Sequence, residues 1–261
     1  MIPNNIHFIF FGFTEFAMIH YLAVKSALRV HKPDNVFIHY TNQPQGNPLW
    51  DEIVKEVTLR YVEPPESFMG VPLTSYQYKA DITRLEILIR EGGIYLDIDV
   101  LSLKPFGDLL NKSCVLGVEA ADDMDSVCLE DARSLTNAVM MCEPNHPFMI
   151  EWLKRTGDNL VNKSWAYHAV CLPHEMLKSG NYPDIHVEPC RSFMPFDFRN
   201  DWVFHNDEGM YQWLLEGSYT MHLWETIWYN GLLKQIDDKY LHNTSNILAR
   251  LFAKYRPYGP Q

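Results

Sequence analysis

Hydrophobic positions in the first part of the chain follow two alternating spacings. Short apolar runs at residues 5–11, 36–40 and 58–62 predict β-strands, whereas residues 16–31 and 49–56 carry apolar side chains at helical spacing. This alternation predicts a parallel, doubly wound α/β sheet flanked by helices, in which ligands bind beyond the carboxyl ends of the strands. The second half of the chain is less regular, with aromatic residues and prolines through residues 189–202.

A helix followed by a short strand is predicted for residues 80–96. Ile82, Leu85 and Leu88 recur at helical spacing. Gly92 and Gly93 then end the helix, because glycine adopts a left-handed backbone at little cost. The apolar run at 94–96 that follows the glycines predicts a buried strand.

Four charged residues frame this helix and strand. Asp81 and Arg84 share one helix face, which fits either an ordinary surface ion pair or a binding site. Asp97 and Asp99 follow the strand, and in extended backbone both carboxylates would point to the same side. Adjacent carboxylates repel each other unless a cation joins them, and such oxygen ligands suit Mg2+ or Mn2+ that bridges to phosphates. The pattern predicts a metal-diphosphate site at the end of the strand.

The combination of these motifs resembles the sugar-binding region of the DXD-containing glycosyltransferases of family 32. That family includes bacterial capsular and yeast mannosyl transferases and the large clostridial glucosylating toxins. The matching positions of its Asp-x-x-Arg helix and Gly-Gly-x-Tyr-x-Asp-x-Asp strand are Asp81, Arg84, Gly92, Gly93, Tyr95, Asp97 and Asp99. The strand at 6–12, the segment 137–148 and the closing His222-Leu223-Trp224 also match, in the family's order. An Asp-x-Asp pair alone would be weak evidence for this family, whereas the combination of motifs is specific to it.

The resemblance implies a GT-A-type, Rossmann-like sheet that binds a nucleotide sugar, with a less regular C-terminal acceptor region. It implies one domain over residues 1–261, with donor binding in about 1–110 and acceptor binding and a lid in about 111–261. The implied reaction moves a hexose from a nucleoside diphosphate sugar to a hydroxyl acceptor, with retention of anomeric configuration. UDP-hexose is the favoured donor and GDP-mannose the alternative. The acceptor hydroxyl could belong to a glycan, a lipid or a protein.

Residue roles follow from the resemblance, position by position. Asp99 would bind Mn2+ or Mg2+ directly, with His222 as a further ligand and Asp97 assisting through water. Asp81 and Arg84 would hold the transferred sugar, and Asp97 would also contact sugar hydroxyls. The expected contacts to the nucleotide and its diphosphate come from Phe8, Ile9, Phe10, Tyr95, Asp97, His222 and Trp224. Trp224 would close over the diphosphate and donate its indole N–H to the leaving oxygen, which makes it part of the catalytic set with the four charged residues.

Composition narrows the classes of function and location. A formal net charge of -11 argues against nucleic-acid binding, which relies on basic patches. The cysteines are odd in number and show no close Cys-x-x-Cys pair, which favours a reducing compartment over a disulfide framework or structural zinc. No apolar run approaches the roughly 20 residues of a membrane span, and the string at 6–13 lacks the basic flank of a signal peptide. We therefore expect a cytoplasmic protein.

Two interpretations fit the end of the chain. Residues 247–255 carry an apolar helical face, and basic residues stand at 239, 250, 254 and 256. The helix could pack on the protein core. It could also rest on an anionic membrane as a peripheral contact.

A second enzyme class resembles the central motif. Residues 96–100 are similar to the first motif of haloacid-dehalogenase-type phosphatases, in which Asp97 would attack phosphorus and Asp99 would act as acid or base. That motif normally follows the first strand of its domain, and it would leave Arg84, His222 and Trp224 unexplained. A protein that only binds sugar would need no metal-diphosphate pair. The sequence therefore favours a metal-dependent glycosyltransferase.

Overall fold

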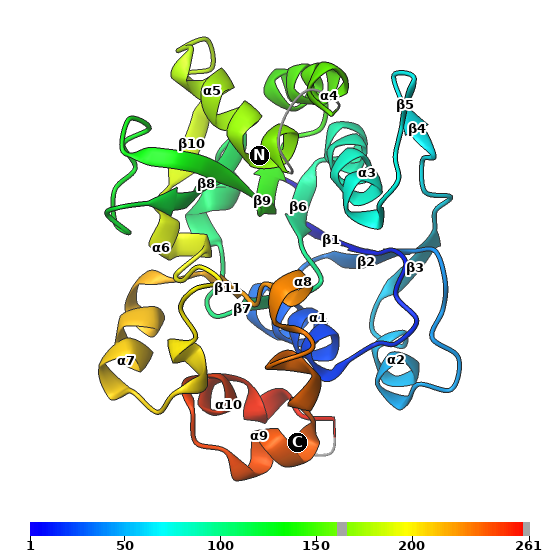
Figure 1. The fold of residues 1–261 in the computed structure, drawn as a ribbon, viewed down its shortest axis with the longest axis vertical. Coiled ribbons are helices and arrows are strands. Elements are labelled where there is room, and N and C mark those ends of the chain that lie inside the picture. Colours follow the sequence, from blue (N-terminus) through cyan, green and yellow to red (C-terminus); the bar gives the residue numbers. More distant parts are fainter. Residues whose placement is uncertain (161–165, 258–261) are drawn as a thin grey trace.

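The central sheet has seven strands and draws on both halves of the chain. The computed structural model describes residues 1–160 and 166–257. In spatial order the strands are β10 (Ile185–Glu188), β8 (Cys114–Ala121), β9 (Ala132–Cys142), β6 (Gly93–Leu96), β1 (Asn5–Phe10), β2 (Asn35–Tyr40) and β3 (Thr58–Tyr61) (Figure 1). Strands β6, β1, β2 and β3 run parallel, while β9 is antiparallel to both β6 and β8.

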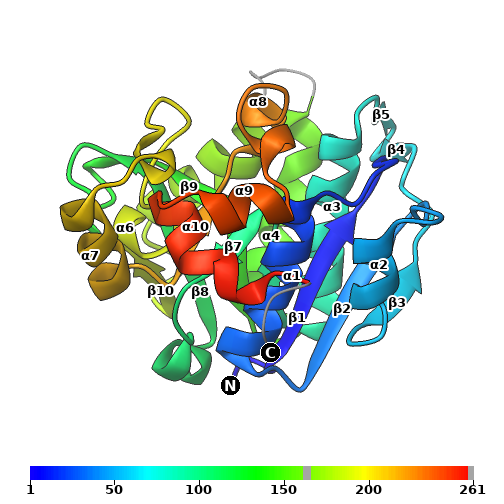
Figure 2. The same ribbon diagram turned by 90° about the horizontal axis from the view of Figure 1, so that it is seen from below.

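The α/β sheet flanked by helices is confirmed. The predicted parallel order holds for β1, β2, β3 and β6, but β9 makes the complete sheet mixed. Helices cover both faces: α1 and α2 lie on one side, and α3 and α4 on the other (Figure 2). The helices are α1 (Met18–His31), α2 (Pro48–Ile53), α3 (Tyr76–Glu91), α4 (Pro147–Asn159), α5 (Leu172–Lys178), α6 (Cys190–Phe193), α7 (Glu208–Gly217), α8 (Glu225–Trp228), α9 (Asp238–Asn243) and α10 (Ile247–Phe252).

The helix–strand unit α3–β6 has the local structure that its sequence predicts. Ser75 caps α3, because its Oγ accepts the backbone N–H of Tyr78 at 3.3 Å. Gly92 and Gly93 follow with φ of 64° and 97°. A Cβ on Gly93 would stand 2.7 Å from the carbonyl oxygen of Asn5, so only glycine lets β6 approach β1 this closely.

Backbone geometry at the Asp-x-Asp motif differs from the expected extended strand. The N–H of Val100 donates to the carbonyl of Asp97 at 2.9 Å, so residues 97–100 form a tight turn between β6 and β7 (Val100–Ser102). The carboxylates of Asp97 and Asp99 are therefore brought together by the turn and not by strand alternation. The sequence predicted the helix and the end of the strand, but it did not predict the tight turn at residues 97–100.

A small antiparallel sheet joins this turn to the C-terminal part of the chain. Strand β7 pairs with β11 (Thr220–His222), and Val100 stands opposite His222. A second small pair, β4 (Ser67–Phe68) with β5 (Val71–Pro72), forms a separate hairpin. The β7–β11 pairing carries the His222-Leu223-Trp224 segment to the carboxyl end of β6.

The C-terminal helix α10 packs on the protein core. Ile247, Leu248 and Phe252 are almost fully buried. Two of the nearby basic residues pair with acids, Arg250 with Glu208 at 2.8 Å and Arg256 with Asp238 at 3.8 Å. The apolar face is therefore covered by the protein, and membrane contact through it finds no support in the structure. Over residues 1–160 and 166–257, no helix has the length and apolar character needed to cross a bilayer.

Candidate active site

A cavity of about 310 Å³ opens at the carboxyl ends of β1 and β6. Its walls come from β1 and the loop after it, α3, the Asp-x-Asp turn, β8, β9 and the segment around α8. Its polar lining includes Asp81, Arg84, Tyr95, Asp97, Asp99, Glu119, Asn137, His222 and Glu225, together with tyrosines of α3. The structure thus gathers in one place the charged residues that the sequence predicts to form the site.

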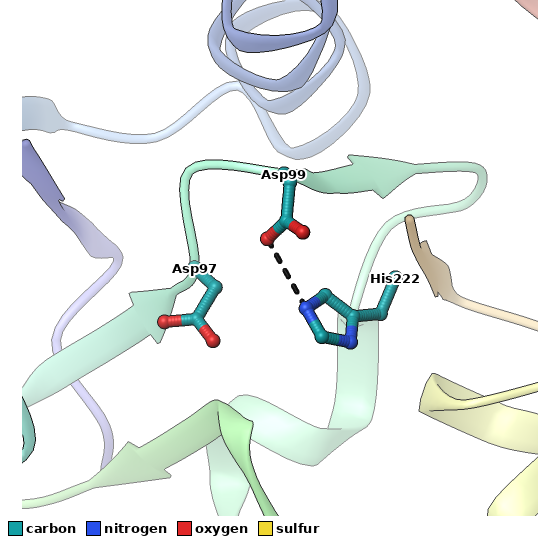
Figure 3. A group of neighbouring side chains, drawn as sticks. All are labelled: Asp97, Asp99 and His222. Carbon is teal, nitrogen blue, oxygen red and sulfur yellow. Dashed lines mark ion pairs between the residues drawn. The ribbon is translucent and has the colours of Figure 1, made fainter. Parts of the chain in front are cut away.

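Two carboxylates and one imidazole converge inside this cavity. Asp97, Asp99 and His222 each offer one ligand atom, and these atoms lie within 4.8 Å of one another (Figure 3). His222 Nε2 lies 3.1 Å from Asp99 Oδ1. Oxygen donors with a single imidazole suit a divalent ion such as Mn2+. The residues therefore fit the predicted metal ion in number, type and proximity.

The two carboxyls of this cluster differ in electrostatic environment. Burial raises the pKa of Asp97, and repulsion from Asp99 adds to the effect, although Arg84 opposes it. Burial would also raise the pKa of Asp99, but attraction and hydrogen bonding from His222 hold it below its usual value. Burial would lower the pKa of His222, yet the Asp99 carboxylate raises it above its ordinary value. Asp99 and His222 consequently form an ion pair that a cation would have to replace.

Arg84 organises a second charged network in the cavity. It is 6% exposed and lies 3.0 Å from Asp97 Oδ1 and 3.2 Å from Asp81 Oδ1. It also donates to the carbonyl of Asn137 at 2.8 Å, and its guanidinium lies 4.6 Å from the ring centre of Tyr95. Burial works against its charge, but the neighbouring carboxylates raise its pKa. The sequence fitted either a surface ion pair or a binding site for Asp81 and Arg84. In the structure these two residues belong to a buried charged network.

Two members of this network were not among the predicted site residues. Asn137 Nδ2 donates to Asp81 Oδ1 at 2.8 Å, and His168 Nε2 lies 3.0 Å from Asp81 Oδ2. Asn137 stands in the segment 137–148 that carries the family resemblance, so its position was available from the sequence. His168 comes from the π-helical turn Tyr167–Cys171, and no spacing along the chain connects it to Asp81.

The segment after β11 closes one side of the cavity. Trp224 has a left-handed backbone with φ of 53°, and its indole N–H donates to the carbonyl of Phe196 at 3.2 Å. The next residue, Glu225, donates its backbone N–H to Asp99 Oδ2 at 2.8 Å. Its side chain lies 2.8 Å from His20 on α1. In this conformation the Trp224 indole is committed to the protein rather than directed at a diphosphate.

The predicted nucleotide contacts along β1 divide by strand alternation. Ile9 lines the cavity, together with Phe11 and Phe13 beyond the strand. Phe8 and Phe10 are fully buried and do not line it. Phe10 stacks on Trp50 in the core, with ring centres 5.5 Å apart. Their placement gives Phe8 and Phe10 a packing role, whereas Ile9, Phe11 and Phe13 form the apolar wall of the cavity.

The predicted Tyr95 lines the cavity but makes its main contacts within the protein. Its hydroxyl donates to Asp97 Oδ1 at 2.6 Å, and the side chain is 1% exposed. The Tyr95 hydroxyl therefore helps to hold the Asp97 carboxylate in position.

Comparison with known proteins identifies the family. The profile described as "Glycosyltransferase sugar-binding region containing DXD motif" matches residues 23–116. Glucan organizing enzyme 1 of Cryptococcus neoformans is 31% identical over 271 aligned positions, which cover 100% of this chain and 72% of the relative. The chain belongs to the DXD-containing glycosyltransferase family. It is a glycosyltransferase, as the resemblance of its motifs implied.

More distant similarities agree with this assignment. Lactosylceramide 4-alpha-galactosyltransferase of Rattus norvegicus is 23% identical to this DXD glycosyltransferase, over 98% of the chain and 74% of the relative. The galactosyltransferase LgtC, solved with donor and acceptor sugar analogs, superimposes with a TM-score of 0.51 at 15% identity, and the match covers 98% of both chains. The GT-A fold is thereby confirmed. The family assignment favours glycosyl transfer over the phosphohydrolase alternative. That alternative needs Asp97 as the attacking group, but Asp97 pairs with Arg84 and accepts a hydrogen bond from Tyr95.

Proposed function

We propose that this glycosyltransferase moves a hexose from a nucleoside diphosphate sugar to a hydroxyl acceptor with the help of a divalent cation. The supporting observation is that the Asp97–Asp99–His222 cluster and the Arg84 network share one cavity. An acidic cavity repels a diphosphate unless positive charge is supplied locally. Arg84 is already paired with two carboxylates, which leaves that task to a metal ion.

Asp99, Asp97 and His222 would hold the metal, and the imidazole ligand favours Mn2+ over Mg2+. When bound, the ion stabilises the negative charge that develops on the leaving diphosphate. Neutral His222 would coordinate it, because a protonated imidazole has no free lone pair. The Glu225 N–H keeps Asp99 oriented, since it binds the oxygen that does not face His222.

Asp81 and Arg84 are proposed to bind the transferred hexose, in an orientation fixed by Asn137 and His168. Asp81 accepts contacts from these neighbours on both oxygens, so it is rigidly placed before any donor binds. A sugar hydroxyl would add to this network without rearranging it. Trp224 would turn from Phe196 to the diphosphate as the lid closes.

The resemblance implies retention of configuration, and the geometry is compatible with front-face attack. Asp81 and Asp97 are both held by Arg84, which weakens them as nucleophiles. The bond from the anomeric carbon to the diphosphate oxygen breaks, and its electron pair leaves with the diphosphate. The acceptor oxygen then bonds to that carbon on the same face, and its proton passes to the departing phosphate oxygen.

Donor and acceptor are proposed only by class. A hexosyl donor is supported by the galactosyltransferase relatives, and UDP-hexose is favoured over GDP-mannose. The donor site would use about residues 1–110 plus Asn137, His222 and Trp224 from the later part of the chain. The acceptor region and lid would occupy about residues 111–261. Cytoplasmic location stays a prediction from the cysteine content.

A thermal-shift screen tests this proposal. Nucleoside diphosphates and their sugars are added singly, with and without Mn2+, because a ligand that binds the folded state raises its melting temperature. We expect a shift that needs both a nucleotide and the metal, followed by release of the nucleoside diphosphate during turnover. Hydrolysis of a phosphomonoester with no response to any nucleotide sugar would refute the proposal.

A further inference from the structure

A second cavity of about 270 Å³ adjoins the proposed donor cavity. Glu119 on β8 lines both of them. The other walls are the end of β8, the start of β9, the loop after α6 and helix α7, and Figure 1 shows α6 beside β8. None of the residues assigned above to the metal ion or the donor lines this second cavity. Glu119 is therefore the side chain that a molecule in the second cavity and a donor in the first could both contact.

Aromatic rings form one wall of the second cavity. Trp202 stands edge-on to Phe196, with ring centres 5.2 Å apart, and edge-on to Trp213 at 6.2 Å. Arg191 covers one face of Trp213, with its guanidinium carbon 4.4 Å from the ring centre. The Trp202 ring is thus steeply inclined to both neighbours, at 74° to Phe196 and 80° to Trp213. An aromatic wall is the kind of surface on which the C–H face of a pyranose ring packs.

Polar groups also line the second cavity, and their charges are balanced. Arg199 donates to Asp197 through Nε at 2.9 Å, and Arg133 pairs with Asp122 at 2.8 Å. Both arginines that line the cavity therefore already have a carboxylate partner. Asn200 adds an exposed amide on the same loop. Such a lining offers hydrogen bonds to hydroxyls without an uncompensated cation, which suits a neutral sugar better than a phosphate or a uronic acid.

Glu119 is held at the boundary between the two cavities. Ser134 on the neighbouring strand β9 donates to its Oε2 at 2.8 Å. This bond holds one carboxylate oxygen of a side chain that lines both cavities. A carboxylate oxygen is an acceptor for a hydroxyl proton.

We propose that the second cavity binds a sugar residue of a neutral glycan acceptor, and that Glu119 accepts a hydrogen bond from its attacking hydroxyl. This rests on the proposed glycosyl transfer and names the acceptor class for it. Glu119 orients the hydroxyl toward the anomeric carbon. It does not keep the proton, which goes to the diphosphate oxygen as the glycosidic bond forms and the bond to the diphosphate breaks.

Saccharide binding without any donor tests the site independently of turnover. The probes are lactose, cellobiose, maltose and mannobiose, with a glucuronic-acid disaccharide as the acidic comparison, followed by saturation-transfer NMR titration. We expect at least one neutral disaccharide to bind, and Trp202→Leu and Asn200→Ala each to weaken it, by about tenfold for the tryptophan change. Asn200 is exposed, so its variant remains informative if Trp202→Leu does not fold. Tyr61→Ala, which changes an exposed aromatic on β3, is the matched control.

Three results would overturn the assignment: no neutral disaccharide binds, binding survives both changes, or the acidic disaccharide binds as tightly. Nucleotide binding with Mn2+ should be unchanged in the Trp202 and Asn200 variants. If the wild type fails to bind any nucleotide sugar but still binds the saccharide through these residues, the proposed donor chemistry fails and the saccharide site stands. In the opposite case the donor site stands alone.

Turnover adds a second readout for Glu119. In Glu119→Gln the ratio of hexose transferred to the saccharide over hexose lost to water should fall by about tenfold or more, because the acceptor hydroxyl is less well oriented. An unchanged ratio would remove Glu119 from acceptor positioning.

Discussion

His222 Nε2 lies 3.1 Å from Asp99 Oδ1, although the two residues come from widely separated parts of the chain. Pairing of β11 with β7 produces this contact, since it sets His222 opposite Val100. The ion pair engages the two side-chain atoms that Asp99 and His222 would offer to a metal ion. Binding of such an ion would therefore depend on how the C-terminal segment places His222.

Asp99→Asn should abolish metal-dependent nucleotide binding and lower transfer on the order of hundredfold or more, because it removes a charged ligand from the leaving-group site. The amide can still accept the Glu225 N–H, so the fold and the lid should remain. Mn2+ titration and initial rates give the measurement. Asp97→Ala should cost nearly as much, and Asp34→Asn, an exposed loop change, is the control. Turnover that persists with EDTA in either site variant would contradict the metal assignment.

Arg84→Lys should weaken binding of the intact sugar donor more than binding of the bare nucleoside diphosphate, because lysine keeps the charge but loses the planar fork. The guanidinium contacts Asp81, Asp97 and the Asn137 carbonyl at once, which an ammonium cannot reproduce. Calorimetry with both ligands and Mn2+ measures the difference, which we expect to be about tenfold. Equal losses for the two ligands would place Arg84 away from the sugar.

Metal affinity should fall as pH falls through the raised pKa of His222. Asp99 favours the protonated imidazole, so His222 competes with the metal for a proton at a higher pH than a free histidine would. The same shift stabilises the metal-free fold below pH 6.5, and this contribution is lost as pH rises through the higher folded-state pKa. Mn2+ titrations between pH 8 and pH 6 should show the decline. A decline of equal steepness in His222→Ala would contradict this assignment.

Acid should destabilise the protein through a separate set of buried histidines. Burial lowers the pKa of His7 to about 4, and of His31 and His39 to about 3. Because these folded-state values lie below the unfolded value, protonation favours the unfolded chain, and stability falls as pH drops below about 6.5. Each histidine should contribute a loss of about 2 kcal/mol between pH 7 and pH 5.

Urea unfolding at these two pH values measures that loss. His39 Nε2 lies 3.1 Å from His7 Nδ1 within the sheet, so His39→Gln keeps a polar partner but does not titrate. This variant should show a smaller pH dependence of the unfolding free energy than the wild type. His205→Gln, which changes a well-exposed histidine, is the matched control. Equal slopes in wild type and His39→Gln would refute the explanation.

Ligands should protect the segment between Asp201 and Asn230 from proteolysis. Trp224 has a left-handed backbone and an indole bonded to Phe196, which suits a lid that rearranges when a diphosphate binds. Limited digestion should be suppressed by donor nucleotide with Mn2+ together, but not by either one alone. Protection that is the same with and without ligands would mean that this segment is fixed core.

The sequence by itself determined the elements that depend on local patterns. The strands and helices of the first part of the chain occur where their hydrophobic spacing predicts, since that spacing reflects which face each element buries. The Asp-x-x-Arg helix, its glycine end and the paired aspartates could likewise be read from adjacent residues. These local motifs were enough to indicate the glycosyltransferase family and the charged centre of the site.

Only the tertiary structure decided which distant residues complete the site. The antiparallel run of β9 carries Asn137 to Asp81, the π-helical turn presents His168, and the β7–β11 pair delivers His222. Strand alternation removes Phe10 from the cavity and admits Phe11. The C-terminal helix illustrates the same limit, because an apolar face fits equally well on a membrane or on a core, and its burial depends on contacts that no local pattern encodes.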